Sequence, residues 1–402
     1  MESGDRAWVL ISIALVMFMT PGLAFFYGGM VRVKHVLAML MLNFICMGVI
    51  TVLWSVIGYS LVFGGTNPVI GNFDHYVLTD VGAGDIEFFS FQMMFAVITP
   101  ALIAGAVADR IRFSAWVWFI VLWSLLVYSP IAHWVWAPDG WLYDMGALDF
   151  AGGTAIHINA GIAALAFVLI LGKRNGWPNH PMPPHSLPLT LIGAGILWFG
   201  WFGFNAGSAF AADGIAAQAL LNTHLAAAAA MIGWLIVEKL VSGHATTLGA
   251  ASGAVAGLVA ITPCAGFVGG AAPLIIGVIA GAICMFAVTL KTKLGYDDSL
   301  DVVGVHFVGG LVGSLLLGLF ADAKINQGIE HEGLFFGGGL KLLGIQALGA
   351  GAAIVWSFVI TAAIVLALKA ILPGGIRPSI EDEETGLDLT QHSEQGYALS
   401  ER

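Results

Sequence analysis

The chain of 402 residues is 58% hydrophobic and only 10% charged, and its formal net charge is −10. A soluble domain is about half apolar and about a quarter charged, so this composition predicts an integral membrane protein with nearly all of its length in the lipid bilayer. The acidic balance argues against nucleic-acid binding, which calls for a basic surface. Cys46, Cys264 and Cys284 lie in apolar runs without metal-ligand spacing, and we expect neither a metal nor another cofactor.

Eleven apolar segments approach the length of roughly 20 residues that a transmembrane helix needs. In chain order they are 8–30, 37–63, 88–108, 114–135, 152–172, 188–209, 216–238, 246–263, 271–291, 302–321 and 340–370. The pattern predicts an all-α, polytopic membrane protein of eleven transmembrane helices, the last of them long enough to tilt. We expect a transmembrane domain over residues 1–372 and a cytoplasmic tail over residues 373–402.

The positive charges fall mainly on one side of the predicted membrane. Twelve of the fifteen Lys and Arg lie in one alternate set of loops or in the tail: Arg32, Lys34, Arg110, Arg112, Lys173, Arg174, Lys239, Lys291, Lys293, Lys369, Arg377 and Arg402. The opposite side holds only Arg6, Lys324 and Lys341. Cytoplasmic loops carry the excess of Lys and Arg, so we expect the N-terminus outside the cell and the C-terminus inside.

Two histidines lie in matching apolar segments, I-H-I-N-A-G around His157 and V-H-F-V-G-G around His306. Each is followed four residues later by a glycine, Gly161 or Gly310. An ionisable group at bilayer depth is costly and points to function, although a histidine bonded to a neighbouring helix for packing is the simpler alternative. The two segments end two halves of five predicted helices, 8–172 and 188–321, which must insert with opposite topology. Such an inverted repeat would bring both histidines together near the midplane of the bilayer.

Several longer motifs occur in a recognisable order. They are T-P-A-L-I-A-G-A-V-A-D-R-I-R-F-S-A (99–115), G-A-L-D-F-A-G-G-T-A-I-H-I-N-A-G (146–161), W-F-G-F-N-A-G-S-A (201–209), D-V-V-G-V-H-F-V-G-G (301–310) and G-L-D-L-T-Q-H-S-E-Q-G-Y (386–397). From about residue 7 to 397 the chain closely resembles the ammonium transporter family, which includes the methylammonium permeases and is related to the Rhesus glycoproteins. The resemblance implies a homotrimer in the plasma membrane, with one ammonium pore per subunit, and no enzymatic activity.

The resemblance also implies roles for single residues. The outer ammonium site would consist of Phe91, Phe95, Trp136 and Ser208, with Trp136 the best match among Trp134, Trp136 and Trp141. Phe95 and Phe204 resemble a stacked phenyl gate, and His157 and His306 would share a hydrogen bond along the pore.

Four further residues stand near these positions in the motifs. Asp149 precedes Gly152 and Gly153 and is suited to cap the helix that follows, besides the structural and electrostatic role that the resemblance gives it. Trp201 and Thr262 match positions around the pore, with plain packing as the alternative. Asp301 lies five residues before His306, and we interpret it as a helix-start or loop-anchoring group.

The implied mechanism is recruitment of NH4+, deprotonation near the gate, passage of NH3, and proton transfer by a histidine–water route, which would make transport electrogenic. The tail is implied to pack along the cytoplasmic face, to couple neighbouring subunits and to receive a PII-type signalling protein. It has Ser393 where the family usually has glycine. A left-handed backbone at that position would disfavour serine.

Three alternatives remain open. The first is an electroneutral NH3 channel of the Rhesus kind. The second is an ammonium sensor that signals through its tail, which would need a separate signalling protein because no kinase or cyclase domain follows residue 402. The third is a membrane cytochrome with His157 and His306 as axial haem ligands, which their glycine-rich helices argue against.

Overall fold

A computed structural model describes residues 2–82 and 84–397, and over these residues the chain is helical without any strand. The long and short α-helices are α1 Ser3–Met30, α2 Val36–Leu53, α3 Tyr59–Phe63, α4 Ile86–Val107, α5 Phe113–Trp123, α6 Ser129–Trp136, α7 Trp141–Asp144, α8 Asn159–Leu171, α9 Leu187–Ala206, α10 Gly214–Ser242, α11 Thr247–Ile261, α12 Ala272–Leu294, α13 Val308–Phe320, α14 Lys341–Ile371, α15 Ile380–Thr385 and α16 Leu387–His392. The predicted all-α class is confirmed.

Short segments of other helical types join several of these helices. Four are π-helical, namely η2 Trp54–Gly58, η4 Ser124–Tyr128, η5 Gly153–Ile158 and η7 Val303–Phe307. Four are 3-10 turns, namely η1 Val33–His35, η3 Tyr76–Leu78, η6 Gly207–Ala209 and η8 Leu334–Phe336. The π-helical segments continue their neighbours, so that α2, η2 and α3 form one stretch, Val33–Phe63, together with η1.

Ten helical stretches in the described residues are long and apolar enough to cross a membrane. Ten of the eleven predicted segments therefore have a counterpart of sufficient length. The remaining one, 246–263, contains α11, an apolar helix of only 15 residues. The count of eleven crossings, the inverted repeat and the orientation stay predictions, and Arg402, which entered the orientation argument, lies outside the described residues.

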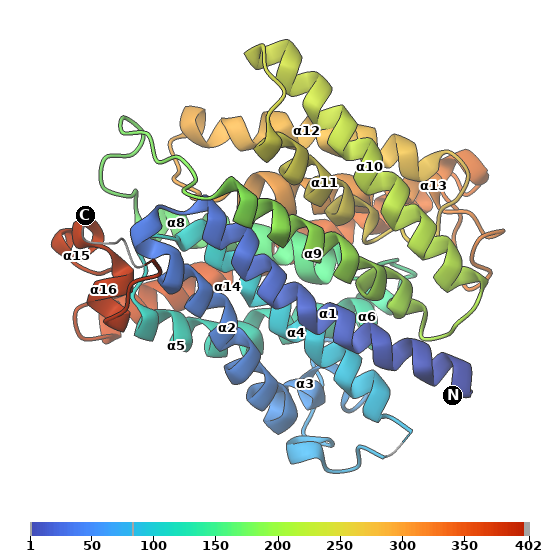
Figure 1. Ribbon diagram of the computed structural model, residues 1–402. Helices are drawn as coiled ribbons and strands as arrows, with labels where there is room; N and C mark the ends of the chain where they lie inside the picture. The colour runs from blue at the N-terminus through green and yellow to red at the C-terminus, as the bar shows by residue number, and fades with distance from the viewer. Residues whose placement is uncertain (1, 83, 398–402) are drawn as a thin grey trace.

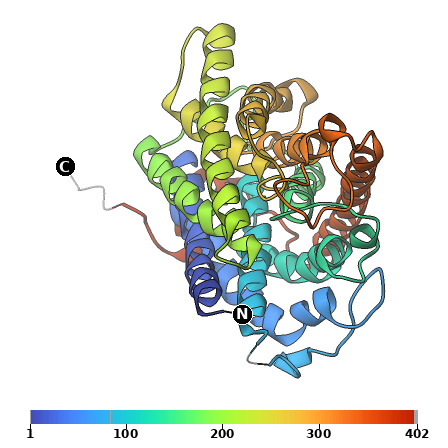
Figure 2. The same ribbon diagram turned by 90° about the vertical axis from the view of Figure 1, so that its right-hand side faces the viewer.

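The long helices run side by side in one bundle (Figure 1). The N-terminus lies at one end of the bundle, whereas α15 and α16 lie at the opposite end (Figure 1). Turned by 90°, the bundle has α10 at one edge and α3 with its following loop at the other (Figure 2). The elements that contain the two matching histidines, η5 and η7, pack against each other inside this bundle.

The described part of the tail is bound to the bundle through its helix α16. The Asp388 carboxylate accepts a hydrogen bond from the Ala38 N–H at 2.8 Å, His35 Nδ1 accepts one from the Leu387 N–H at 3.2 Å, and Gln391 Oε1 accepts one from the Phe113 N–H at 2.6 Å. The donors lie at the starts of α2, α16 and α5, so each bond caps the first turn of one helix. The acidic composition of the tail alone suggests disorder, so these tertiary contacts decide the outcome.

Ser393 ends α16 with φ 56° and ψ 33°, in the left-handed region of backbone conformation. This is the geometry for which glycine is better suited, because a side chain there is disfavoured by about 1–2 kcal/mol. Ser393 therefore adopts the left-handed backbone conformation that disfavours serine. Residues 398–402 of the predicted tail lie outside the described residues.

Candidate functional site

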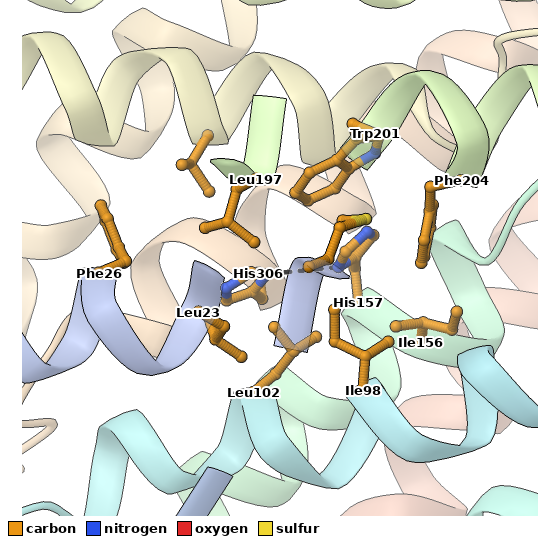
Figure 3. A pocket seen from close by; sticks show the side chains of 12 residues that line it. Leu23, Phe26, Ile98, Leu102, Ile156, His157, Leu197, Trp201, Phe204 and His306 are labelled. Atoms are coloured by element: carbon orange, nitrogen blue, oxygen red, sulfur yellow. Dashed lines mark hydrogen bonds between the residues drawn. The ribbon is translucent and has the colours of Figure 1, made fainter. Parts of the chain in front are cut away.

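His157 and His306 meet at the centre of the bundle. Their Nδ1 atoms lie 3.3 Å apart, and their rings are nearly parallel, with centroids 5.3 Å apart and an interplanar angle of 17° (Figure 3). Both side chains are buried. For the two rings to share a hydrogen bond, one Nδ1 must carry a proton and the other must accept it. The two predicted histidines are thus brought into direct contact across 149 residues of sequence.

Both histidines stand in π-helical segments, His157 in η5 and His306 in η7. A π-helical turn accommodates one extra residue within a helix and occurs often at functional sites. The two glycines four residues further on allow the close approach. An ideal Cβ on Gly161 would lie 2.3 Å from the backbone nitrogen of Phe307, and one on Gly310 would lie 3.0 Å from the Cβ of His157. Each glycine therefore faces the other histidine segment.

Both histidines line a narrow cavity. Its other walls are apolar or aromatic and come from five helices: Met19, Leu23, Phe26, Ile98, Leu102, Ile156, Leu197, Trp201, Phe204 and Val255. Phe204 and Trp201 lie at one end, Phe26 lies at the other, and the histidine pair lies between them (Figure 3). The imidazole nitrogens are consequently the polar groups that a small molecule in this cavity would meet.

Four aromatic side chains named in the sequence form one cluster next to this cavity. Phe95 stacks on Phe204 with centroids 4.3 Å apart at 15°, and it lies 4.8 Å from Phe91 and 6.0 Å from Trp136 by the same measure. The Phe204 ring is in turn 6.2 Å from the His157 ring.

Of the three candidate tryptophans, Trp136 contacts this cluster. The Nε1–H of Trp134 instead donates to the Val69 carbonyl oxygen at 2.7 Å. Phe210, which the sequence did not single out, packs 5.0 Å from Phe91 with φ 54°. Its position after the F-N-A-G motif carried no signal that distinguishes it from a packing residue.

Ser208 and Trp201 each make one defined hydrogen bond. The Ser208 hydroxyl donates to the Phe204 carbonyl oxygen at 2.8 Å, which leaves its own lone pairs as acceptors. The Trp201 Nε1–H donates to Thr262 Oγ1 at 2.9 Å, and its indole stacks on His157 with centroids 5.5 Å apart at 18°. Thr262 is buried and connects to the histidine pair through Trp201.

Asp149 caps the start of η5 with its carboxylate. Its two oxygens accept four backbone N–H groups, those of Gly152, Gly153, Thr154 and Ala155, at 3.0, 2.5, 2.9 and 3.0 Å. These donors are among the ones that a helix start leaves unpaired, so Asp149 fixes the turn that holds His157. Its carbonyl oxygen also accepts the Trp136 Nε1–H at 2.9 Å. The capping expected from the sequence is present, and the carboxylate is fully used by it.

Asp298 is the corresponding carboxylate in the second half. It accepts the Val303 N–H at 2.8 Å at the start of η7, and burial raises its pKa to about 6. Asp301, singled out from the sequence, instead receives a hydrogen bond from Lys291 Nζ at 2.5 Å and anchors the loop. The missed signal was spacing, because Asp149 and Asp298 each stand eight residues before a histidine.

Comparisons with known proteins agree with this arrangement. The Ammonium Transporter Family model matches residues 7–397. The ammonium transporter of Mycobacterium bovis is 51% identical over 98% of this chain and 90% of that protein, and the ammonium transporter of Bacillus subtilis is 46% identical over 99% of both. The crystal structure of Candida albicans Mep2 superimposes with a TM-score of 0.90 at 38% identity, over 95% of this chain and 88% of that one. This chain belongs to the ammonium transporter family.

Proposed function

We propose that this ammonium transporter takes up ammonium selectively across the plasma membrane by separating NH4+ into NH3 and a proton. NH4+ is recruited at the outer aromatic site, NH3 passes the phenyl gate and the histidine pair, and the proton is transferred alongside. The observation that carries the proposal is the direct contact of His157 with His306, 3.3 Å between Nδ1 atoms, in an apolar cavity next to stacked Phe95 and Phe204.

Recruitment has to distinguish NH4+ from K+, which is of nearly the same size. Ammonium differs because it donates hydrogen bonds in a tetrahedral arrangement. Aromatic faces on Phe91, Phe95 and Trp136 attract a cation by about 0.5–2 kcal/mol each. Ser208 Oγ adds a directional acceptor, since its own proton is committed to the Phe204 carbonyl oxygen. A site of this kind favours a cation that can donate a hydrogen bond.

The stacked rings of Phe95 and Phe204 then act as the gate. Both are buried, and their centroid distance of 4.3 Å leaves no space for a water molecule or an ion between them. Passage therefore requires one of the two rings to rotate, and this rotation opens a space for one small molecule. A charged species would lose its hydration in this apolar neighbourhood at a cost of several kcal/mol, whereas NH3 would lose much less.

The histidine pair supports passage of NH3 and relay of the proton. Their protonation states are coupled, because the shared hydrogen bond needs one donor and one acceptor. His157 Nε2 has no hydrogen-bond partner among the described residues, so it is available to a molecule in the cavity. The histidine pair would exchange protons with the molecule in the cavity, and neither ring would hold a fixed charge.

Assembly into a homotrimer has support from the outer surface of the bundle. His224 is exposed on the predicted transmembrane helix α10, and its ring lies 5.4 Å from Trp198 on α9. A polar ring facing lipid at that depth is costly, so a neighbouring subunit is the better cover. The bound tail, residues 373–397, is correspondingly the proposed contact between subunits and the docking site of a PII-type partner.

The alternatives have less support. A sensor role is not favoured, because the curated relatives quoted above are named transporters. A porphyrin cannot enter between His157 and His306, since the two rings are already in contact. The electroneutral channel differs from the proposal only in the fate of the proton, and the experiment below separates the two.

The test is the transient current of proteoliposomes on a solid-supported membrane after a pulse of ammonium or, as a reference, of potassium. A current with ammonium alone is expected, and His157→Ala combined with His306→Ala should abolish it or remove its selectivity. His244→Ala, an exposed loop position, is the control. Ammonium entry without current, detected as a rise of internal pH, would contradict the electrogenic step.

A further inference from the structure

His133 has an unusual set of hydrogen-bond partners. Its side chain is buried in the last turn of α6, with Nδ1 2.6 Å from the Val62 carbonyl oxygen and Nε2 2.6 Å from the Asn67 carbonyl oxygen. A carbonyl oxygen only accepts hydrogen bonds, whereas a neutral imidazole carries a single N–H. In either neutral tautomer, one ring lone pair would therefore point at an oxygen lone pair 2.6 Å away.

We propose that His133 carries protons on both ring nitrogens and, as an imidazolium, binds the last turn of α3 and the loop around Asn67 to α6. We call this pair of hydrogen bonds the clasp. In this way His133 is a positioning residue for Trp136. The second part rests on the role proposed above for Trp136 in the outer site, whereas the protonation state does not.

The surroundings suit a buried cation. His133 lies at the C-terminal end of α6, where unpaired carbonyl groups leave partial negative charge. No carboxylate in the described residues lies within ion-pair distance of it, so the helix end and the two carbonyl oxygens are the groups that offset a positive charge on the ring. The elements that pack against α6 contribute the titratable side chains Tyr59, Tyr128, Tyr143, Asp144 and His157, and His133 hydrogen-bonds to none of these. The loop 64–72 contributes no titratable side chain.

The same loop is held by two more donors from this region. The Trp134 Nε1–H donates to the Val69 carbonyl oxygen at 2.7 Å, and the Trp141 N–H donates to the Pro68 carbonyl oxygen at 3.1 Å. His133 thus supplies one of three hydrogen bonds that hold the loop backbone at Asn67, Pro68 and Val69, and its second hydrogen bond holds Val62 in the last turn of α3.

Trp136 is the last residue of α6, three residues after His133. Its Nε1–H is bound to the Asp149 carbonyl oxygen, and its ring lies against Phe95. The clasp therefore fixes the end of α6, while the Asp149 carbonyl oxygen fixes the indole. Loss of the clasp would leave the indole with one anchor.

The protonation state can be read directly from the wild-type protein. Ala132–His133 is the only Ala–His sequence in the chain, so carbonyl-¹³C alanine with ¹³C,¹⁵N-histidine selects His133 in solid-state NMR of reconstituted protein. At mildly alkaline pH, where an ordinary histidine with a pKa of about 6.5 is neutral, both ring nitrogens should give signals of protonated nitrogen. One unprotonated ring nitrogen would overturn the proposal.

The positioning role is tested with His133→Phe, which keeps a ring but removes both donors. We expect the KM for external ammonium to rise about fivefold, the equivalent of roughly one hydrogen bond, with a smaller change in maximal current.

His185→Phe is the control, because His185 bonds one carbonyl and the Tyr397 hydroxyl at the opposite end of the bundle. An unchanged KM in a folded His133→Phe protein would overturn the positioning role, and a failure of Trp136→Ala to affect KM would instead contradict the outer site. If His133→Phe does not fold, the NMR result on the wild-type protein still decides the protonation state.

Discussion

At the scale of single residues, two aspartates cap the helical turns that hold the two histidines. Asp149 accepts four backbone N–H groups at the start of η5, whereas Asp298 is hydrogen-bonded to the Val303 N–H at the start of η7. Both are buried, and both stand eight residues before a histidine. The number of donors that each satisfies is the main difference between them, and this difference can be measured.

Replacement of Asp149 should cost more stability than replacement of Asp298. A hydrogen bond to a charged group contributes about 1.5–3 kcal/mol. Because Asp149→Ala leaves four backbone N–H groups without their acceptor, this variant should lose at least about 3 kcal/mol of unfolding free energy. Asp149→Asn keeps one acceptor oxygen and should lose less than Asp149→Ala. Denaturant titration of the purified protein in mixed micelles measures these losses. Equal losses for Asp149→Ala and Asp298→Ala would show that burial, rather than capping, determines the effect.

At the scale of helices, contact between η5 and η7 depends on a pair of glycines. An added Cβ on Gly161 would meet Phe307 backbone at 2.3 Å, while one on Gly310 would meet its nearest neighbours at 3.0 Å. Gly161→Ala should therefore push the segments apart and destabilise the protein by about 1–3 kcal/mol, with loss of ammonium current. Gly310→Ala should have a smaller effect on both measurements.

The control for these variants is Gly195→Ala on α9, because nothing lies within 4 Å of an added Cβ there. Alanine is the better helix former by about 1 kcal/mol, so this change should be neutral or stabilising. If Gly161→Ala keeps both its stability and its current, then the close approach of the two segments is not required for transport.

Much of this architecture follows from the sequence because membrane helices have a strong compositional signal. The matching places of His157 and His306 in two predicted halves, together with the family resemblance, led to the prediction that the two segments meet, and the contact of the two rings confirms that they do. The π-helical turns η5 and η7 could not be predicted, since the extra residue in each turn is accommodated by tertiary packing and leaves hydrophobicity unchanged. The clasp at His133 was missed for a related reason, because its partners are backbone carbonyl groups, which every residue possesses.

At the scale of the whole molecule, α11 decides the number of membrane crossings, because it is shorter than the ten stretches that are long enough to span a bilayer. Its 15 residues rise about 22 Å at 1.5 Å per residue, whereas the hydrocarbon core is about 30 Å thick. All residues from 251 to 261 are buried, so this helix is surrounded by protein. A helix in that position need not match the bilayer, because irregular backbone at membrane depth is tolerated where protein covers it.

Crossing by α11 would place its two flanks on opposite sides of the membrane. The native Cys46, Cys264 and Cys284 are buried, so a cysteine introduced at an exposed flank provides the labelling signal. With an impermeant maleimide on intact cells, we expect Ala271→Cys to be labelled and Val241→Cys to be labelled only after permeabilisation. Gly4→Cys, at the predicted outer end, is the positive control. Labelling of both flanks from one side would mean that α11 does not cross, that the number of crossings is even, and that the two halves cannot form the predicted inverted repeat.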